Sequence, residues 1–241
     1  MKKICIIWAS SGIGLETLEQ YTKKWYTVDF TLRNTSQKIE FQKRFPKSHI
    51  YIVDLSQLNQ IASFWEDVSD RFYDTIIFAA GVWYYKIFEN LKAEELTEQL
   101  RVNTLAPIQI LQEYFMSHDY IDTKFVYLSS VMERIPSKNM SIYGASKRAA
   151  TQILWAYKSE SPELKILIVM LGAVKTPMHE KSGLWKPVWK KLQKTVQKLL
   201  KTIERYEGTR TLYIDWLFIL WFVFPLYNLF LFFKNIWSKY L

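Results

Sequence analysis

The stretch IIWASSGIGLE, residues 6–16, decides the fold, because an apolar run enters a small, glycine-rich bend and a helical pattern follows it. A bend of this kind, placed between a first strand and a helix, directs free N–H groups and the positive end of the helix toward a phosphate. The bend therefore predicts a nucleotide site, although a tight connection without a ligand is compatible with the same pattern. Trp8 stands where such a turn normally carries its first glycine.

Further along the chain, short apolar runs alternate with stretches of helical spacing. The predicted strands cover residues 4–8, 27–32, 49–55, 75–80, 124–130, 165–171 and 210–214, and the clearest helical patterns cover 57–70, 91–116 and 145–160. Several of the runs are apolar on both faces, which is typical of a parallel sheet covered by helices on each side. We therefore predict an α/β protein with a Rossmann-like, doubly wound parallel sheet of about seven strands over residues 1–214, whose ligand lies at the carboxyl ends of the strands.

Composition limits the class of protein. The chain has 241 residues, of which 49% are hydrophobic, and this is enough for one well-buried domain. Its single cysteine, Cys5, excludes a disulfide within one chain and favours a reducing compartment. The basic and then apolar N-terminus resembles a signal peptide, but the apolar run is short and passes directly into the glycine turn, so we expect no export.

The positive charge is concentrated near the C-terminal end. Residues 181–210 contain nine Lys or Arg and two Glu, whereas the whole chain has a net charge of +9. A basic domain is one sign of nucleic-acid binding. Here the basic segment precedes the nearly uncharged stretch WLFILWFVFPLYNLFLFF, residues 216–233, so we favour an anionic membrane surface over nucleic acid.

A tyrosine and a lysine four residues apart form the first candidate catalytic group. Tyr143 and Lys147 would share one helix face, and a nearby ammonium would lower the pKa of the phenol. Such pairs arise by chance, and Tyr120 with Lys124 is a second one. Only Tyr143 has a hydroxyl thirteen residues before it at the end of a strand, that of Ser130.

Seven short motifs then occur in order: ASSGIG (9–14), DLS (54–56), AAG (79–81), VNTLAP (102–107), LSS (128–130), YGASK (143–147) and LGAVKTPM (171–178). Their order and spacing resemble those of the short-chain dehydrogenase/reductase family over roughly residues 3–214. The resemblance implies hydride transfer between a nicotinamide cofactor and a carbonyl or alcohol carbon. The cofactor would carry the difficult chemistry.

The resemblance also implies the roles of individual residues. Tyr143 would be the general acid/base, Ser130 would stabilise the reacting oxygen, Lys147 would lower the Tyr143 pKa and hold the ribose, and Asn103 would support Lys147 and a relay water. Basic Arg33, at the end of the second strand, favours NADP over NAD. The implied cofactor-binding residues are Ser10, Ser11, Gly12, Ile13, Gly14, Arg33, Asp54, Leu55, Ala80, Gly81, Asn103, Tyr143, Lys147, Gly172, Val174 and Thr176.

Three positions depart from the family pattern. Trp8 replaces the first glycine, Phe78 and Ala79 replace asparagines before Ala80 and Gly81, and Leu171 replaces a proline. None of these changes affects a catalytic side chain. Neighbouring residues of a strand point to opposite faces, so we expect Trp8 to leave the site usable with some effect on cofactor affinity.

The C-terminal stretch suggests a second, membrane-associating part at residues 215–241. Eighteen uncharged residues would form a helix of roughly 27 Å, slightly shorter than a ~30 Å hydrocarbon layer. Pro225 interrupts the stretch, so spanning and half-inserted arrangements both stay open, as does a dimerisation segment. The upstream basic residues would place the catalytic domain on the cytoplasmic side.

Together these features predict a membrane-tethered oxidoreductase that prefers NADP and acts on a small, lipophilic carbonyl or alcohol, without a metal and without nucleic acid. The aromatic segment 179–187 is a candidate lid over such a substrate. A homo-oligomer is compatible with this prediction. The alternative is a non-catalytic NADP(H)-binding sensor or scaffold on the same fold, which Trp8 and Phe78 would favour.

Overall fold

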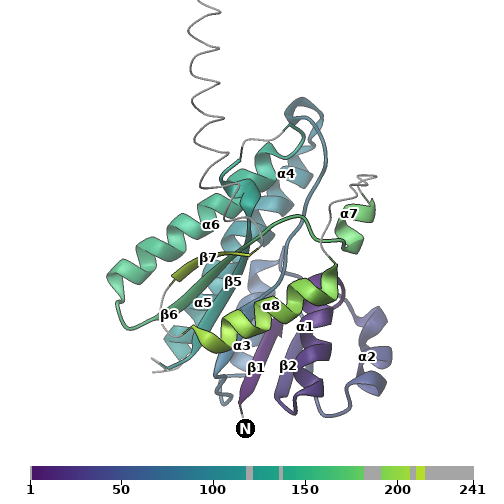
Figure 1. Cartoon of the computed structure of the whole chain (residues 1–241), viewed down its shortest axis with the longest axis vertical. Coiled ribbons are helices and arrows are strands. Elements are labelled where there is room, and N and C mark those ends of the chain that lie inside the picture. Colours follow the sequence, from purple (N-terminus) through teal and green to yellow (C-terminus); the bar gives the residue numbers. More distant parts are fainter. Residues whose placement is uncertain (1, 118–121, 136–137, 182–190, 207–209, 215–241) are drawn as a thin grey trace, which may run out of the picture.

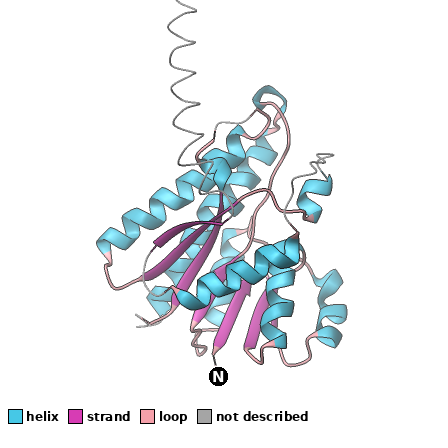
Figure 2. Ribbon diagram, viewed as in Figure 1, coloured by secondary structure: helices cyan, strands magenta, loops and turns pink. Residues whose placement is uncertain are grey.

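A parallel sheet of seven strands forms the centre of the protein in a computed structural model of the chain (Figures 1 and 2). The structure describes residues 2–117, 122–135, 138–181, 191–206 and 210–214. The strands are β1 (Lys3–Ile7), β2 (Thr27–Leu32), β3 (Ile50–Ile52), β4 (Thr75–Phe78), β5 (Lys124–Ser130), β6 (Lys165–Leu171) and β7 (Arg210–Ile214). They lie in the order β3-β2-β1-β4-β5-β6-β7, which confirms the predicted Rossmann-like, doubly wound topology.

The pairing of β1 with both β2 and β4 sets the position of the ligand site. Ile4 pairs with Val28 on one side and with Thr75 on the other, and all the pairings are parallel. The chain winds outward from β1 in one direction to β3 and in the other direction from β4 onward, so the strand order reverses between β1 and β4. In sheets of this kind the crevice outside the carboxyl ends of these two strands receives the ligand.

Helices cover both faces of the sheet (Figure 1). The helices are α1 (Gly12–Lys23), α2 (Lys38–Arg44), α3 (Leu58–Asp67), α4 (Ala93–Leu100), α5 (Ala106–Ser117), α6 (Ser141–Glu160), α7 (Pro177–Lys181) and α8 (Leu192–Arg205). Helices α1, α2 and α8 contribute to one buried cluster, and α3, α5 and α6 contribute to the other. The apolar face of α8, with Val196, Leu199, Leu200 and Ile203, therefore lies in the core.

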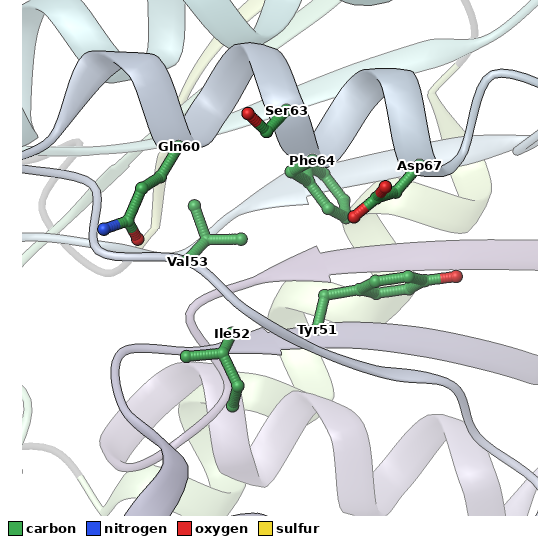
Figure 3. A pocket seen from close by; sticks show the side chains of 7 residues that line it. All are labelled: Tyr51, Ile52, Val53, Gln60, Ser63, Phe64 and Asp67. Atoms are coloured by element: carbon green, nitrogen blue, oxygen red, sulfur yellow. The ribbon is translucent and has the colours of Figure 1, made fainter.

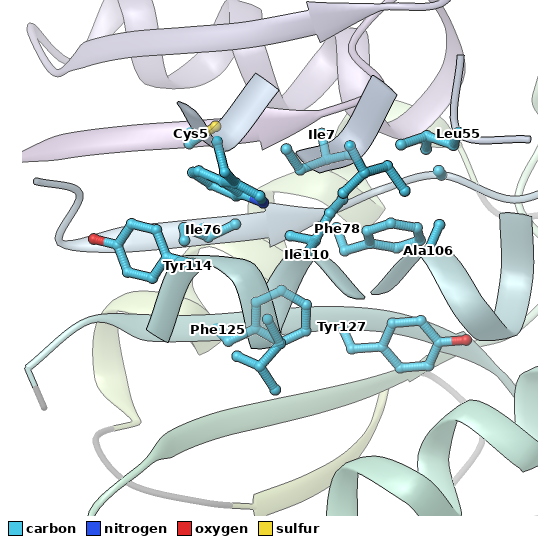
Figure 4. Close-up of a cluster of buried hydrophobic side chains, with 14 of the residues drawn as sticks. Cys5, Ile7, Leu55, Ile76, Phe78, Ala106, Ile110, Tyr114, Phe125 and Tyr127 are labelled. Atoms are coloured by element: carbon cyan, nitrogen blue, oxygen red, sulfur yellow. The ribbon is translucent and has the colours of Figure 1, made fainter. Parts of the chain in front are cut away.

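The strands contribute side chains to both buried clusters, because successive side chains of a strand point to opposite faces of the sheet. In β5, Phe125 and Tyr127 point into the cluster below α3, α5 and α6 (Figure 4), whereas Val126 and Leu128 point into the opposite one. Because β1, β4, β5 and β6 are buried on both faces, their sequences are continuous apolar runs.

Some of the predicted strands and helices are longer than those in the structure. The first strand ends at Ile7, because the next residue, Trp8, has φ = +69° and leaves the extended conformation. The third strand is limited to 50–52 and the fourth to 75–78. The predicted continuous helix over 91–116 is divided by η3 (Arg101–Leu105), a five-residue π-helical turn. Such turns occur frequently at functional sites.

The predicted hydrophobic tail lies outside the described residues, as does most of the lid candidate at 179–187. Among the helices that the structure describes, none has both the length and the apolar character needed to cross a bilayer.

One departure from the family pattern is a core residue. Phe78 is fully buried, and its ring lies 5.9 Å from that of Tyr127 (Figure 4). We expect Phe78→Asn to lower the free energy of unfolding by about 3–5 kcal/mol, because it removes a buried ring and buries an amide. Denaturant unfolding would measure this loss. Phe88→Asn is the control, because Phe88 is 61% exposed, and an equal effect of both changes would contradict the assignment.

Candidate active site

Glycines line the carboxyl ends of β1 and β4, where the topology places the ligand. Helix α1 begins at Gly12, which has φ = +56°, and its N-cap, Ser11, makes no side-chain capping bond. A Cβ atom on Gly14 would lie 2.2 Å from the main-chain oxygen of Trp8, so only glycine permits this close approach of helix and strand. The uncapped N–H groups of this first turn are available to an anion. Ser10, Ser11 and Ile13 are at least partly exposed in the same turn.

Trp8 adopts the left-handed backbone conformation that glycine favours, at a cost of about 1–2 kcal/mol for a side chain of this kind. Its N–H donates to Thr31 Oγ1 at 2.8 Å, and its partly buried indole packs against the core cluster that contains Leu55 and Ala80. The guanidinium carbon of Arg33 lies 5.8 Å from the centre of the indole. The turn therefore keeps its glycine-like backbone, while the indole packs beside Arg33.

Arg33 is held by two carboxylates. Its Nη2 atom lies 2.8 Å from Glu98 Oε1 and its Nε atom lies 3.6 Å from Asp54 Oδ2, while 41% of its side chain is exposed. Asp54 also accepts hydrogen bonds from the main-chain N–H and the hydroxyl of Ser56 at its other oxygen. Arg33 and Asp54, both implied cofactor-binding residues, are thus close together. Glu98, which sequence reasoning missed, is the second partner of Arg33 and also accepts a hydrogen bond from Tyr84.

The catalytic candidates meet at the ends of β5 and α6. A side-chain hydrogen bond joins Ser130, the last residue of β5, to Tyr143 in the first turn of α6. One turn further along α6, Lys147 is 2% exposed and its Nζ donates to the main-chain oxygens of Ala80 at 3.1 Å and Leu128 at 3.0 Å. A Cβ atom on Gly81 would lie 3.5 Å from Lys147 Nζ, in ordinary contact, so this residue after β4 lies directly beside the ammonium.

The pKa shift of Tyr143 differs from the sequence-based expectation, and the pKa of Lys147 is shifted as well. Burial raises the pKa of Tyr143, and the hydrogen bond with Ser130 only partly offsets this effect. Burial also lowers the pKa of Lys147 to about 7, while the charge of Glu133 acts in the opposite direction. The net shift of the Tyr143 pKa is therefore upward, opposite to the direction expected from the sequence, because desolvation of the phenol outweighs the hydrogen bond with Ser130.

Asn103 lies inside the π-helical turn η3 and is fully buried. Its side-chain amide donates to the main-chain oxygen of Val82 at 2.8 Å and to Ser146 Oγ at 3.0 Å, and its Oδ1 accepts from the N–H of Val82 at 2.8 Å. These three bonds tie the segment after β4 to α6. Asn103 thus holds the backbone beside the site through its side chain.

Tyr127 is a functional candidate that sequence reasoning missed. Its hydroxyl donates to the main-chain oxygen of Asn103 at 3.0 Å, and its ring centre lies 4.9 Å from Lys147 Nζ. Burial raises the pKa of Tyr127, so the hydroxyl stays protonated and remains a donor. Its position three residues before Ser130 on β5 gives no signal in the sequence, because residues i and i+3 of a strand face opposite sides.

The segment after β6 approaches the phosphate turn from the other side. A Cβ atom on Gly12 would lie 3.6 Å from two carbons of Thr176, so these distant residues nearly touch. Val174 and Thr176 are buried, Gly172 is partly exposed, and Thr176 Oγ1 lies 3.0 Å from His179 Nδ1. The predicted nicotinamide segment is thus placed across the crevice from α1.

A group of aromatic rings centred on Trp83 lies next to Tyr143. The ring of Trp83 lies 6.0 Å from that of Tyr143, 5.2 Å from that of His179 and 5.6 Å from that of Tyr85. Burial lowers the pKa of His179, which favours a neutral imidazole. A substrate that approaches Tyr143 would therefore meet flat, uncharged groups.

A cavity of about 170 Å³ lies away from these residues, between β3 and α3 (Figure 3). Its lining consists of Tyr51, Ile52, Val53, Gln60, Ser63, Phe64 and Asp67. None of these is a predicted site residue, although Gln60 accepts a hydrogen bond from the N–H of Asp54 at 2.9 Å. This cavity is therefore not the crevice that contains Tyr143.

The residues at these strand ends fit a nicotinamide dinucleotide in their donor groups. The first turn of α1 offers uncapped N–H groups to a pyrophosphate, Gly14 lets that turn pack against the end of β1, and Gly81 lies beside Lys147. Arg33 follows β2 and Thr176 follows β6, so the two residues lie on opposite sides of β1 and β4 along the row of strand ends. A doubly wound sheet with these features defines the class of dinucleotide-binding α/β proteins.

Comparison with known proteins agrees with this class. The family model described as short chain dehydrogenase matches residues 2–187. The curated Arabidopsis thaliana protein "11-beta-hydroxysteroid dehydrogenase-like 3" is 28% identical over 249 residues, which cover 93% of this chain and 78% of that protein. This chain therefore belongs to the short-chain dehydrogenase family of oxidoreductases.

Solved structures have the same fold. An alcohol dehydrogenase from Thermococcus sibiricus, complexed with 5-hydroxy-NADP, is similar at a TM-score of 0.79 and 21% identity, over 89% of this chain and 96% of that chain. A 4-hydroxyisoleucine dehydrogenase complexed with NADH is similar at a TM-score of 0.78 and 21% identity, over 89% of this chain and 97% of that chain.

Proposed function

We propose that this protein catalyses the NADP(H)-dependent interconversion of a lipophilic carbonyl compound and its alcohol. The observation that carries the proposal is the meeting of Ser130, Tyr143 and Lys147 at one strand end. A bound nicotinamide would supply the hydride chemistry. Ser130 Oγ would donate a hydrogen bond to the reacting oxygen. The Tyr143 hydroxyl would give its proton to that oxygen in reduction, and the Tyr143 phenolate would accept the proton of the alcohol in oxidation.

The charge of Lys147 would favour ionisation of Tyr143 in the oxidation direction. The same ammonium lies beside Gly81, where it could also donate to a ribose hydroxyl. Asn103 and Tyr127 would hold the backbone and the ammonium in place around this pair.

A lipophilic substrate is supported by two observations. The aromatic group of Trp83, Tyr85 and His179 beside Tyr143 offers apolar surface to a substrate. The Arabidopsis relative is named for a hydroxysteroid, which is a lipophilic alcohol.

The test of this function uses Tyr143→Phe. We expect NADPH oxidation against a panel of apolar ketones and aldehydes to fall by about 10²- to 10⁴-fold, because the proton donor is lost. NADPH binding, measured by fluorescence, should be retained, since the aromatic ring at position 143 stays in place. Binding without turnover on any substrate in the unaltered protein would instead favour the sensor or scaffold. That alternative is supported by Trp8 in the turn and by the pairing of Arg33 with carboxylates.

The preference for NADP is assigned to Arg33. We expect Arg33→Ala to weaken NADPH binding by about 10- to 100-fold, because a charge-assisted bond to the 2′-phosphate is lost, and to leave NADH binding nearly unchanged. Fluorescence titration with both cofactors measures this difference. Arg44→Ala is a matched control, because Arg44 is similarly exposed and also paired with a carboxylate. Equal losses for both cofactors would contradict the assignment.

We also propose, from the sequence alone, that residues 215–241 associate with a membrane and that the catalytic domain lies on its cytoplasmic side. The uncharged stretch 216–233 and the basic segment before it support this proposal. Membrane fractionation should recover the full chain with membranes and release a chain that ends at Ile214. Recovery of the full chain in the membrane-free fraction would contradict the proposal.

A further inference from the structure

A buried carboxylate lies behind the catalytic strand end. Glu133, the last residue of η4 (Val131–Glu133), has a side chain with 0% exposure. Its Oε2 atom accepts hydrogen bonds from Ser129 Oγ at 2.5 Å and Thr151 Oγ1 at 2.7 Å, and its Oε1 atom lies 3.2 Å from Arg134 Nε. Buried carboxylates are costly unless they are paired, and this one is hydrogen-bonded at Oε2 only, while Oε1 faces the Arg134 guanidinium without a hydrogen bond in the described part of the chain.

Strand β5 and helix α6, which supply Ser129 and Thr151 to Glu133, also hold Lys147. On α6, Thr151 lies one turn after Lys147, on the same helix face. On β5, the main-chain oxygen of Leu128 accepts from Lys147, and the next residue, Ser129, donates to Glu133. Adjacent groups on one strand and one helix therefore fix the ammonium and the carboxylate relative to each other.

Lys147 has little else to stabilise its charge. Its hydrogen bonds go to neutral main-chain oxygens, and none of the ion pairs in the described part of the chain includes it. The groups that act on it are the ring of Tyr127 on β5, whose centre is 4.9 Å from Nζ, and the charge of Glu133 in η4, while Tyr143 lies one turn before it on α6. Burial lowers the Lys147 pKa to about 7, and Glu133 is the group that raises it.

We propose that Glu133 is a positioning residue whose buried negative charge keeps Lys147 protonated, while Arg134 partly offsets that charge. The catalytic consequence rests on the proposed function, because a protonated Lys147 is what would favour the ionised form of Tyr143. The sequence gives no sign of this role, since Glu133 lies outside the spacing of Ser130, Tyr143 and Lys147.

The direct test follows the titration of Lys147 in the full chain by NMR of ¹³C-labelled lysine side chains. Lys147→Met identifies its signal. In Glu133→Gln, which has nearly the same shape, the midpoint should move to lower pH by about one pH unit, because a negative charge near the ammonium is lost. In Arg134→Gln the midpoint should move to higher pH, because the opposing cation is removed.

Two controls separate charge from structure. Ser129→Ala and Thr151→Val each remove one hydrogen bond to Glu133 but keep its charge, so their midpoints should move less than that of Glu133→Gln. An unchanged midpoint in a folded Glu133→Gln protein would overturn the proposal. If Glu133→Gln does not fold, Arg134→Gln decides, and a midpoint that stays or falls would overturn it.

The titration needs neither cofactor nor turnover. If no carbonyl compound is reduced but the midpoints move in opposite directions, the proposed function fails and the role of Glu133 stands. If turnover is found, Glu133→Gln should shift the pH profile of alcohol oxidation by an amount similar to the NMR midpoint. A change in rate at every pH without such a shift would indicate a structural role only and would overturn the proposal.

Discussion

The burial of the Lys147 ammonium is the constraint on which the site depends. Its two hydrogen bonds join the end of β4, at Ala80, and the end of β5, at Leu128, to one face of α6. An ammonium without water must keep such partners, because an unpaired buried charge is very costly. The positions of the strand ends and of the first turns of α6 are therefore linked, and Tyr143 and Ser130 are held within reach of each other.

The surroundings of this ammonium include Glu133, a residue outside the seven sequence motifs. Main-chain oxygens orient the ammonium but carry no full charge, and the ring of Tyr127 adds only a cation–π attraction. Glu133 is the group whose charge opposes the effect of burial on the Lys147 pKa. The proposed acid/base group of Tyr143 and Lys147 thus belongs to a larger buried network that extends through β5, η4 and α6.

Trp8 shows how the fold accommodates a departure at its most demanding turn. The backbone keeps a positive φ without glycine, and the bonds at Thr31 and the packing of the indole offset the strain. The indole lies near Arg33, whose two carboxylate partners form a polar group at the same end of the crevice. Any phosphate that binds Arg33 has to compete with Asp54 and Glu98.

The sequence by itself determined the parallel sheet, the phosphate turn and the order of the site motifs, because apolar periodicity and glycine spacing are local properties. It also paired Tyr143 with Lys147 and separated them from Tyr120, since helix spacing and a serine at a strand end are readable in one dimension. The end of β1 at Ile7, by contrast, depended on the positive φ of Trp8, which no residue propensity indicates.

Only the tertiary structure decided the π-helical turn at Asn103, the bond from Tyr127 to that turn and the buried position of Glu133. It also reversed the expected direction of the Tyr143 pKa. The physical reason is the same in each case: desolvation and long-range contacts depend on which residues the fold brings together. Nothing in the local sequence records how much water is removed from a side chain.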